Sequence, residues 1–393
     1  MTSPPAGSAQ RPPSARCVAR RLLVLTAGLA AGCSSSGASH EIPDAHSDAQ
    51  NVIHLDAGTT DAKGKPVDAS SAAANGTLGA WQSLSPMPLP RANHCAVAAA
   101  GYLVVIGGNY EADGGTSFID IDAVHVAAIR ADGTLGAWSQ AGSTPSPVSG
   151  CTAAANGSTI YLVDGIYDDM ADQGHAFSAE LSASGTLGSW TALGALPNTE
   201  DAFSSDAWFL ASSAGTLLAM GSTLTATAAL ELTTVPTTGA WSADTWLPGF
   251  LGRPEYAFTG SYVYALGGYL SNDGGNPTVT TATGAAVESD GKVGTPFVTG
   301  ALPSPITFGR AVAVDAWVFV VGGKSSLFGP GESGTYSAKV GASGQLGTWS
   351  AQAALPEGRT DMALTLSGDF LYLTGGGYMG PGVASVFSAR VRF

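Results

Sequence analysis

The hexapeptide Gly-Thr-Leu-Gly-Ala-Trp at residues 76–81 decides the fold, because it returns along the chain at nearly regular intervals. It recurs unchanged at 133–138, as Gly-Thr-Leu-Gly-Ser-Trp at 185–190 and as Gly-Gln-Leu-Gly-Thr-Trp at 344–349. Degenerate copies supply two further anchors, one of them a phenylalanine in place of the indole. The anchors are Trp81, Trp138, Trp190, Trp241, Phe297 and Trp349, spaced 51 to 57 residues apart. Such a period indicates an array of similar units.

A second marker lies out of phase with the first and consists of an apolar run that ends in glycine. The clearest copies are residues 102–108, 262–268, 317–323 and 370–376, with weaker copies at 160–165 and 216–221. Six markers of each kind predict six units. The unbroken apolar runs favour strands covered on both faces, and the repeated tryptophans are expected to pack between neighbouring units.

Each unit is expected to hold four antiparallel strands, A to D. In the first unit they are predicted at 93–100, 102–107, 122–130 and 134–141. The last unit lacks strand D, because its strand C at 383–391 nearly reaches Phe393, while an unpartnered D-type segment at 76–84 precedes the first unit. We therefore predict an all-β, six-bladed propeller that the N-terminal strand closes, leaving no free sheet edge.

These residues resemble the kelch-type repeat, which has paired glycines after a second strand, a downstream tryptophan and a Pro-Arg step before the next first strand, here Pro90-Arg91. The resemblance covers residues 76–393 and implies a kelch-like propeller. Kelch domains that bind acidic peptides use arginines on their loop face. Bacterial sialic-acid mutarotases are six-bladed kelch propellers too, so the resemblance also leaves a sugar epimerase open.

The N-terminal region predicts export and a lipid anchor. Arginines precede a ten-residue apolar run at 22–31, which is too short to span a bilayer and is followed by Gly32-Cys33. Residues 29–33 resemble the bacterial lipobox, although Ala30 stands where that pattern prefers Leu, Val or Ile. Residues 1–33 are thus interpreted as a lipoprotein-type signal peptide with Cys33 lipidated, and an ordinary secretory signal is the alternative. We expect a bacterial protein anchored to the outer membrane or cell surface.

Residues 34–75 are rich in Ser, Ala, Asp and Gly without apolar periodicity, which predicts a disordered tether before the propeller at 76–393. The chain has 16 Lys and Arg against 30 Asp and Glu, for a formal net charge of −14. This balance disfavours a nucleic-acid or anionic-surface partner. Membrane contact is expected through the anchor only, and the protein is expected to be a monomer.

Antiparallel alternation places the D-to-A and B-to-C connections on one face, which carries the long loops where binding usually resides. Four of seven arginines in the mature chain lie in or just after the D-to-A connections: Arg91, Arg253, Arg310 and Arg359. The long loops bring aromatic and acidic side chains: Tyr110, Tyr167, Tyr269, Asp113, Asp169 and Asp273. We predict a ring of guanidinium groups that recognises a carboxylate or an anionic sugar. The alternative is that these guanidinium groups satisfy loop carbonyls.

The sequence leaves three functions open. The first is a non-catalytic module that binds a protein or glycan on the long-loop face. The second is a carbohydrate-active enzyme such as a sugar mutarotase or epimerase, which requires ionisable side chains that converge with an arginine at the channel mouth. The third is a structural envelope protein with a flat face. No sequence motif of a catalytic or metal site is present, so no cofactor is expected; Asp-rich loops keep Ca²⁺ as a minor alternative to solvated acids.

Cys95 and Cys151 each stand six residues before a turn glycine, which places them at equivalent positions on neighbouring inner strands. In an oxidising compartment this spacing favours a disulfide, and two buried unbridged thiols are the alternative.

Overall fold

The computed structural model describes residues 76–112, 117–163, 175–195, 209–213, 216–222, 227–233, 242–247, 251–270, 276–288, 291–377 and 382–392. All of them belong to one compact unit, Ile53–Phe393. Within these ranges the secondary structure consists of strands without an α-helix. No helix with the length and apolarity needed to cross a membrane is therefore found among them. The predicted signal peptide and tether, residues 1–75, lie outside the described residues.

The described strands form six sheets of four or more strands and a small ribbon. Sheet 1 contains β3 (Cys95–Ala99), β4 (Tyr102–Ile106), β7 (Ala123–Ile129) and β8 (Leu135–Ser143); sheet 2 contains β9 (Thr152–Asn156), β10 (Thr159–Val163), β11 (His175–Glu180) and β12 (Thr191–Ala195); sheet 3 contains β13 (Phe209–Ser213), β14 (Thr216–Ser222), β15 (Thr227–Thr233) and β16 (Ser242–Leu247). Sheet 4 contains β17 (Glu255–Phe258), β18 (Tyr262–Leu266), β19 (Ala282–Ala286) and β20 (Phe297–Val298); sheet 5 contains β21 (Arg310–Val314), β22 (Trp317–Val321), β23 (Thr335–Lys339) and β24 (Ser350–Ala351). Sheet 6 contains β25 (Ala363–Ser367), β26 (Phe370–Thr374) and β27 (Val386–Arg392), joined by β1 (Thr77–Leu78) and β2 (Gln82–Leu84); β5 (Asn109–Ala112) and β6 (Ser117–Asp120) form the ribbon.

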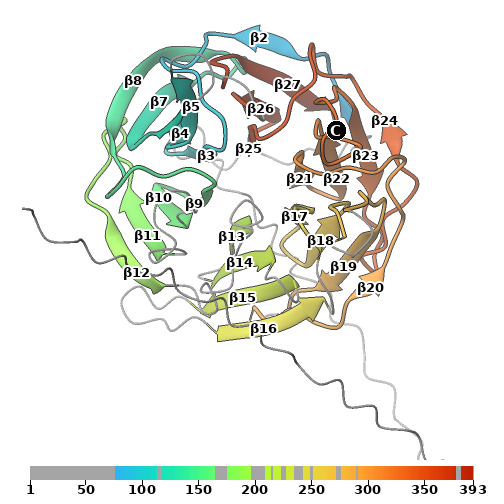
Figure 1. The fold of residues 1–393 in the computed structure, drawn as a ribbon. Helices are drawn as coiled ribbons and strands as arrows, with labels where there is room; N and C mark the ends of the chain where they lie inside the picture. Colours follow the sequence, from blue (N-terminus) through green and yellow to red (C-terminus); the bar gives the residue numbers. More distant parts are fainter. Residues whose placement is uncertain are drawn as a thin grey trace, which may run out of the picture. The chain divides into compact units, whose positions relative to one another are not determined.

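The sheets lie side by side around a common centre, with the first strand of each sheet innermost (Figure 1). This arrangement is that of an all-β propeller. Strands pair antiparallel in chain order within sheets 1 to 5, which confirms the predicted order A to D. The middle strands β4, β18, β22 and β26 are buried along almost their whole length, as the apolar runs predict.

Pairing between the two ends of this unit confirms the predicted closure. β1 and β2 both run antiparallel to β27, with Thr77 opposite Arg392 and Ser83 opposite Phe387. Figure 1 shows β2 beside β27, which lies at the other end of the colour scale. The outer edge of sheet 6 is therefore covered by the segment that precedes sheet 1 in the chain.

The repeated tryptophans connect neighbouring sheets, as the sequence predicts. In the four described copies the indole Nε1 donates a hydrogen bond to a carbonyl at the end of the preceding sheet: Trp81 to Ala353 (3.1 Å), Trp138 to Ser85 (3.1 Å), Trp190 to Ser143 (2.9 Å) and Trp349 to Gly300 (2.9 Å). Trp241 lies outside the described residues. An indole that is apolar on its faces and satisfied at its N–H suits such a partly buried seam.

The first glycine of the hexapeptide is required at the same seam. Gly133 has φ +80°, and a Cβ there would lie 2.3 Å from the ring of Phe370 in sheet 6. Gly76, Gly185 and Gly344 likewise face Trp317, Tyr102 and Tyr262 of the preceding sheet. The hexapeptide thus recurs because both its ends make contacts between sheets.

The closure can be tested at Trp81, which is buried. Trp81→Ala should lower the free energy of unfolding by about 3–5 kcal/mol, because it leaves a cavity and removes the bond to Ala353. Trp81→Phe should cost less, since most of the packing is kept. Urea unfolding of both variants provides the measurement. Wild-type stability in Trp81→Ala would show that the N-terminal segment contributes nothing to the propeller.

Candidate functional site

The paired glycines of sheet 1 position the connection that leads into sheet 2. Gly107 and Gly108 have φ values of +58° and +89°, and Gly108 N donates a 2.7 Å hydrogen bond to Val148 O. A Cβ on Gly107 would lie only 2.3 Å from the same carbonyl oxygen. The second glycine of sheets 4, 5 and 6 bonds in the same way to Ile306, Arg359 and Arg91. Close backbone approach is therefore what the double glycine provides.

Two residues beyond each of these four carbonyls the chain adopts a left-handed conformation, and the corresponding residue before sheet 4, Arg253, does so too. These residues, which we call the inner ring, are Asn93, Gly150, Arg253, Phe308 and Asp361, with φ values from +46° to +65°. Backbone hydrogen bonds connect several of them across sheets: Gly150 N to Asn93 O (2.8 Å), Asn93 N to Asp361 O (3.0 Å) and Asp361 N to Phe308 O (3.1 Å). The corresponding position before sheet 3 lies outside the described residues.

Four inner-ring residues carry a side chain despite the left-handed backbone. This conformation costs an L-residue roughly 1–2 kcal/mol, and glycine would avoid the cost. Phe308, with φ +60°, is the least expected of the four, because bulky residues rarely adopt this region. Strain of this kind concentrates at binding sites. The space that these side chains surround is therefore a candidate site.

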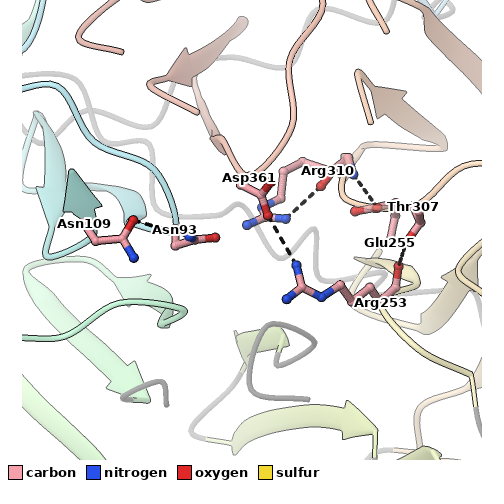
Figure 2. Close-up of polar contacts among 8 residues, drawn as sticks. Asn93, Asn109, Arg253, Glu255, Thr307, Arg310 and Asp361 are labelled. Atoms are coloured by element: carbon pink, nitrogen blue, oxygen red, sulfur yellow. Dashed lines mark hydrogen bonds and ion pairs between the residues drawn. The ribbon is translucent and has the colours of Figure 1, made fainter. Parts of the chain in front are cut away.

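They surround a central cavity of about 120 Å³, into which the ends of β3, β9, β17, β21 and β25 converge. Its charged side chains are Arg253 and Glu255 of sheet 4, Arg310 of sheet 5 and Asp361, which precedes sheet 6. Figure 2 shows Arg253 and Asp361 reaching toward each other, with Arg310 and Glu255 beside them. Arg253 Nη1 lies 3.4 Å from Asp361 Oδ1. Three repeats thus contribute two guanidinium groups and two carboxyl groups to one space.

An aromatic ring forms part of the wall between two cations. The Arg253 guanidinium lies 4.1 Å from the centroid of the Phe308 ring, and the Lys324 ammonium lies 4.7 Å from it. Both distances suit cation–π attraction. The position of Arg253 is therefore maintained by a ring contact as well as by Asp361.

The two carboxyl groups have unusual surroundings. Glu255 is buried, and its Oε1 accepts a 2.6 Å hydrogen bond from Gly309 N. Burial raises the pKa of Glu255 to about 7, although the Arg310 charge opposes the rise. Burial also raises the pKa of Asp361 against the opposing charges of Arg253 and Arg310. Among the described residues, Asp361 Oδ2 is buried with no hydrogen-bond partner.

Cys95 and Cys151 form a disulfide beside this cavity, with their Cα atoms 5.7 Å apart. Their predicted equivalence is off by one residue. Cys95 pairs with Ile106 and Thr152 pairs with Val163, so the position equivalent to Cys95 is Thr152. The offset has a physical cause: neighbouring sheets meet through opposite faces, and successive residues of a strand point to opposite faces.

The four predicted arginines do not form one ring. Arg253 and Arg310 line the central cavity, whereas Arg91 is fully buried in sheet 1. The Arg91 guanidinium donates to Gly107 O (2.8 Å) and to His125 Nδ1 (3.0 Å). Burial lowers the pKa of Arg91 to about 10, and burial together with Arg91 lowers the pKa of His125. The contact with Gly107 O is of the kind that the alternative interpretation predicts, in which the arginine satisfies loop carbonyls.

Arg359 occupies the place equivalent to Arg91, two residues before the inner ring. It is buried, and its Nη2 donates to Glu357 and to Ser385 Oγ (2.6 Å). Arg359 borders a different pocket, between sheets 5 and 6. Two residues of separation are thus enough to turn an arginine away from the centre.

The predicted rim is only partly described. Tyr110 lies in β5 opposite Ile119, and Tyr269 makes isolated bridges to Gly252 and Thr278. Neither tyrosine is among the described residues that line the central cavity. Four of the other predicted residues, Tyr167, Asp113, Asp169 and Asp273, lie outside the described residues, as does Cys33.

Sequence reasoning missed Asn93, Glu255, Phe308 and Asp361. A constant spacing could have located the inner-ring positions. Each inner-ring residue stands seven positions before the left-handed residue of the A-to-B turn in the sheet that follows it, as Phe308 does before Asp315. As for metals, no group of three or more His, Cys, Asp and Glu side chains able to hold an ion is found in the described part of the chain.

Comparisons with family models and with curated proteins found no match. Among solved structures, the chain is similar to the structure of YjhT, with a TM-score of 0.56 at 12% sequence identity. The alignment covers 77% of this chain and 96% of that one. At this identity the likeness supports the propeller fold and carries no residue roles.

The raised pKa of Glu255 predicts a pH dependence of stability. The folded protein favours the protonated carboxyl, so the stabilisation is complete below pH 4.5, the ordinary pKa, and is lost as the pH rises to about 7. Relative to Glu255→Gln, which does not titrate there, the wild type should lose about 3 kcal/mol of unfolding free energy over this interval. Urea titrations from pH 4 to 8 measure the difference. Parallel pH profiles for the two proteins would contradict it.

Proposed function

We propose that this protein is a six-bladed, kelch-type propeller lipoprotein that binds the acidic end of a carbohydrate in the central cavity without altering it. The observation that carries the proposal is the convergence of Arg253 and Arg310 with Glu255 and Asp361 inside the inner ring. Guanidinium groups bind carboxylates strongly, and the carboxyl groups accept hydrogen bonds from sugar hydroxyls.

The size of the cavity favours a small ligand group over a protein surface. Its volume of about 120 Å³ is close to the roughly 150 Å³ of a protein cavity that takes up one benzene molecule. A carboxylate with its neighbouring carbons fits such a space, and the rest of the ligand would extend outward. The rigid backbone of the inner ring and the disulfide beside it keep the charged groups in place before binding, which reduces the entropic cost of association.

A second function at the same cavity is catalysis, because the cavity meets the requirement stated for the enzyme. Ionisable side chains do converge with arginines at the channel mouth, and Glu255, with a pKa of about 7, suits proton transfer to or from a bound sugar. A mutarotase or epimerase is the corresponding activity. The third alternative, a structural envelope protein, predicts a flat face, and the presence of cavities on this face does not favour it.

Binding is tested by calorimetric titration with glucuronate, galacturonate and N-acetylneuraminate, with glucose as the neutral comparison. The wild type should bind at least one of the acids and not glucose. Arg310→Gln combined with Arg253→Gln should lower the affinity by about 100-fold or more, since a hydrogen bond to a charged group contributes about 1.5–3 kcal/mol. Arg390→Ala, which removes an exposed guanidinium paired with Asp369, should leave the affinity unchanged.

Unchanged affinity in the double variant, with its fold verified by circular dichroism, would eliminate the two arginines from recognition. Proton NMR of the anomeric signals in the same samples separates binding from catalysis. Faster interconversion of anomers with wild type than with Glu255→Gln would establish the second function in place of the first.

Export and anchoring form a separate part of the proposal and rest on the apolar run 22–31 and Cys33. In a bacterial host, Cys33→Ser should abolish incorporation of labelled palmitate and release the protein from the membrane fraction. Cys95→Ser should retain the label. Labelling of the Cys33→Ser protein would refute lipidation at this position.

A further inference from the structure

A second pocket, which we call the seam pocket, lies where sheets 5 and 6 meet. It has a volume of about 380 Å³, within the roughly 300–1,000 Å³ typical of ligand sites. The connection between β22 and β23 contributes Lys324 and Phe328, and the connection between β24 and β25 contributes Arg359 and Thr360. Both connections belong to the face on which the central cavity opens.

The seam pocket and the central cavity share a wall. The ammonium group of Lys324, which borders the seam pocket, lies over the ring of Phe308, which lines the central cavity. Thr360 borders the seam pocket and the next residue, Asp361, borders the cavity. A ligand group seated in the cavity therefore has the seam pocket directly beside it.

Phe328 is the most unusual side chain of the seam pocket, because 85% of its surface is exposed. A phenyl ring that stays in water contributes nothing to the core, whereas its burial is favourable. Four of the other lining residues are glycines: Gly329, Gly331, Gly358 and Gly377. Gly331 and Gly358 approach so closely that a Cβ on Gly358 would lie 2.0 Å from Gly331 O. An exposed aromatic ring in a pocket whose other lining is rich in glycine is suited to a flat ring-shaped ligand group.

Both cationic groups that border the seam pocket already have partners, Lys324 in the Phe308 ring and Arg359 in Glu357, which favours an uncharged ligand group there. The Arg359 guanidinium pairs with Glu357 and bonds to Ser385. Its Nε is buried and has no hydrogen-bond partner among the described residues, and Arg359 as a whole is 5% exposed.

We propose that the seam pocket is a second carbohydrate subsite, in which an uncharged sugar ring stacks on Phe328 while the acidic residue attached to it occupies the central cavity. This inference rests on the proposed function of the central cavity and extends it from a single acidic sugar to an oligosaccharide that ends in one. The apolar face of the sugar ring covers the phenyl ring, and its oxygens face the Arg359 side and the glycine backbone.

The test compares free N-acetylneuraminate and glucuronate with trisaccharides that end in the same acids, by titration with the full chain. The wild type should bind one trisaccharide about tenfold more tightly than its free acid, equivalent to about 1.4 kcal/mol. Phe328→Ala should remove this preference while the affinity for the free acid stays within about twofold, a difference of about 0.4 kcal/mol. Phe118→Ala is the matched control, since Phe118 is also an exposed aromatic, at 58%, but lies in β6 away from both pockets.

Each outcome supports or overturns one step. Equal affinity for trisaccharide and free acid in the wild type would overturn the seam subsite and leave the proposed function intact. The same would follow from an unchanged preference in Phe328→Ala. Failure of every acidic sugar to bind the wild type would overturn the proposed function and the second subsite together.

Discussion

The hydrogen bonds between β27 and the segment of β1 and β2 are the interaction on which the rest of the described structure depends. Each sheet packs against its neighbours in the ring, but the outer edge of sheet 6 has no strand partner unless the segment that precedes sheet 1 supplies one. With Thr77 opposite Arg392, this edge is covered and the first strands of the sheets converge on one centre. Charged residues from three separate repeats can then occupy a single cavity.

The inner ring concentrates a conformational cost at that centre. Its backbone is the same at five described positions, yet the side chains range from none at Gly150 to phenyl at Phe308. Uniform backbone with varied side chains is what results when packing between sheets sets the conformation and does not restrict the side chain. Glycine at all five positions would relieve this strain, but it would also remove the side chains that these positions place in the cavity.

The charges in the cavity are also balanced by groups from several sheets. Arg253 contacts both Asp361 and the Phe308 ring, and Glu255 takes its hydrogen bond from the backbone of the next sheet. The ion pair of Arg253 with Asp361 joins two separate repeats. Relative displacement of two sheets would therefore separate partners and leave buried charges unpaired, which is expensive. The disulfide between Cys95 and Cys151 opposes such displacement at another seam of the same ring.

The sequence by itself determined the all-β class, the four-strand order within a repeat, the closing N-terminal segment and the role of the tryptophans between sheets. These properties follow from local periodicity and from contacts that every repeat makes in the same way. Only the tertiary structure decided which charged groups meet. Arg91 and Arg253 both follow a D-to-A connection, yet one is buried in its own sheet and the other faces the cavity. The direction of Arg91 depends on a turn whose carbonyl, Arg91 O, accepts a hydrogen bond from Gly376 N of sheet 6, far away in the chain, and no local pattern of residues encodes that contact.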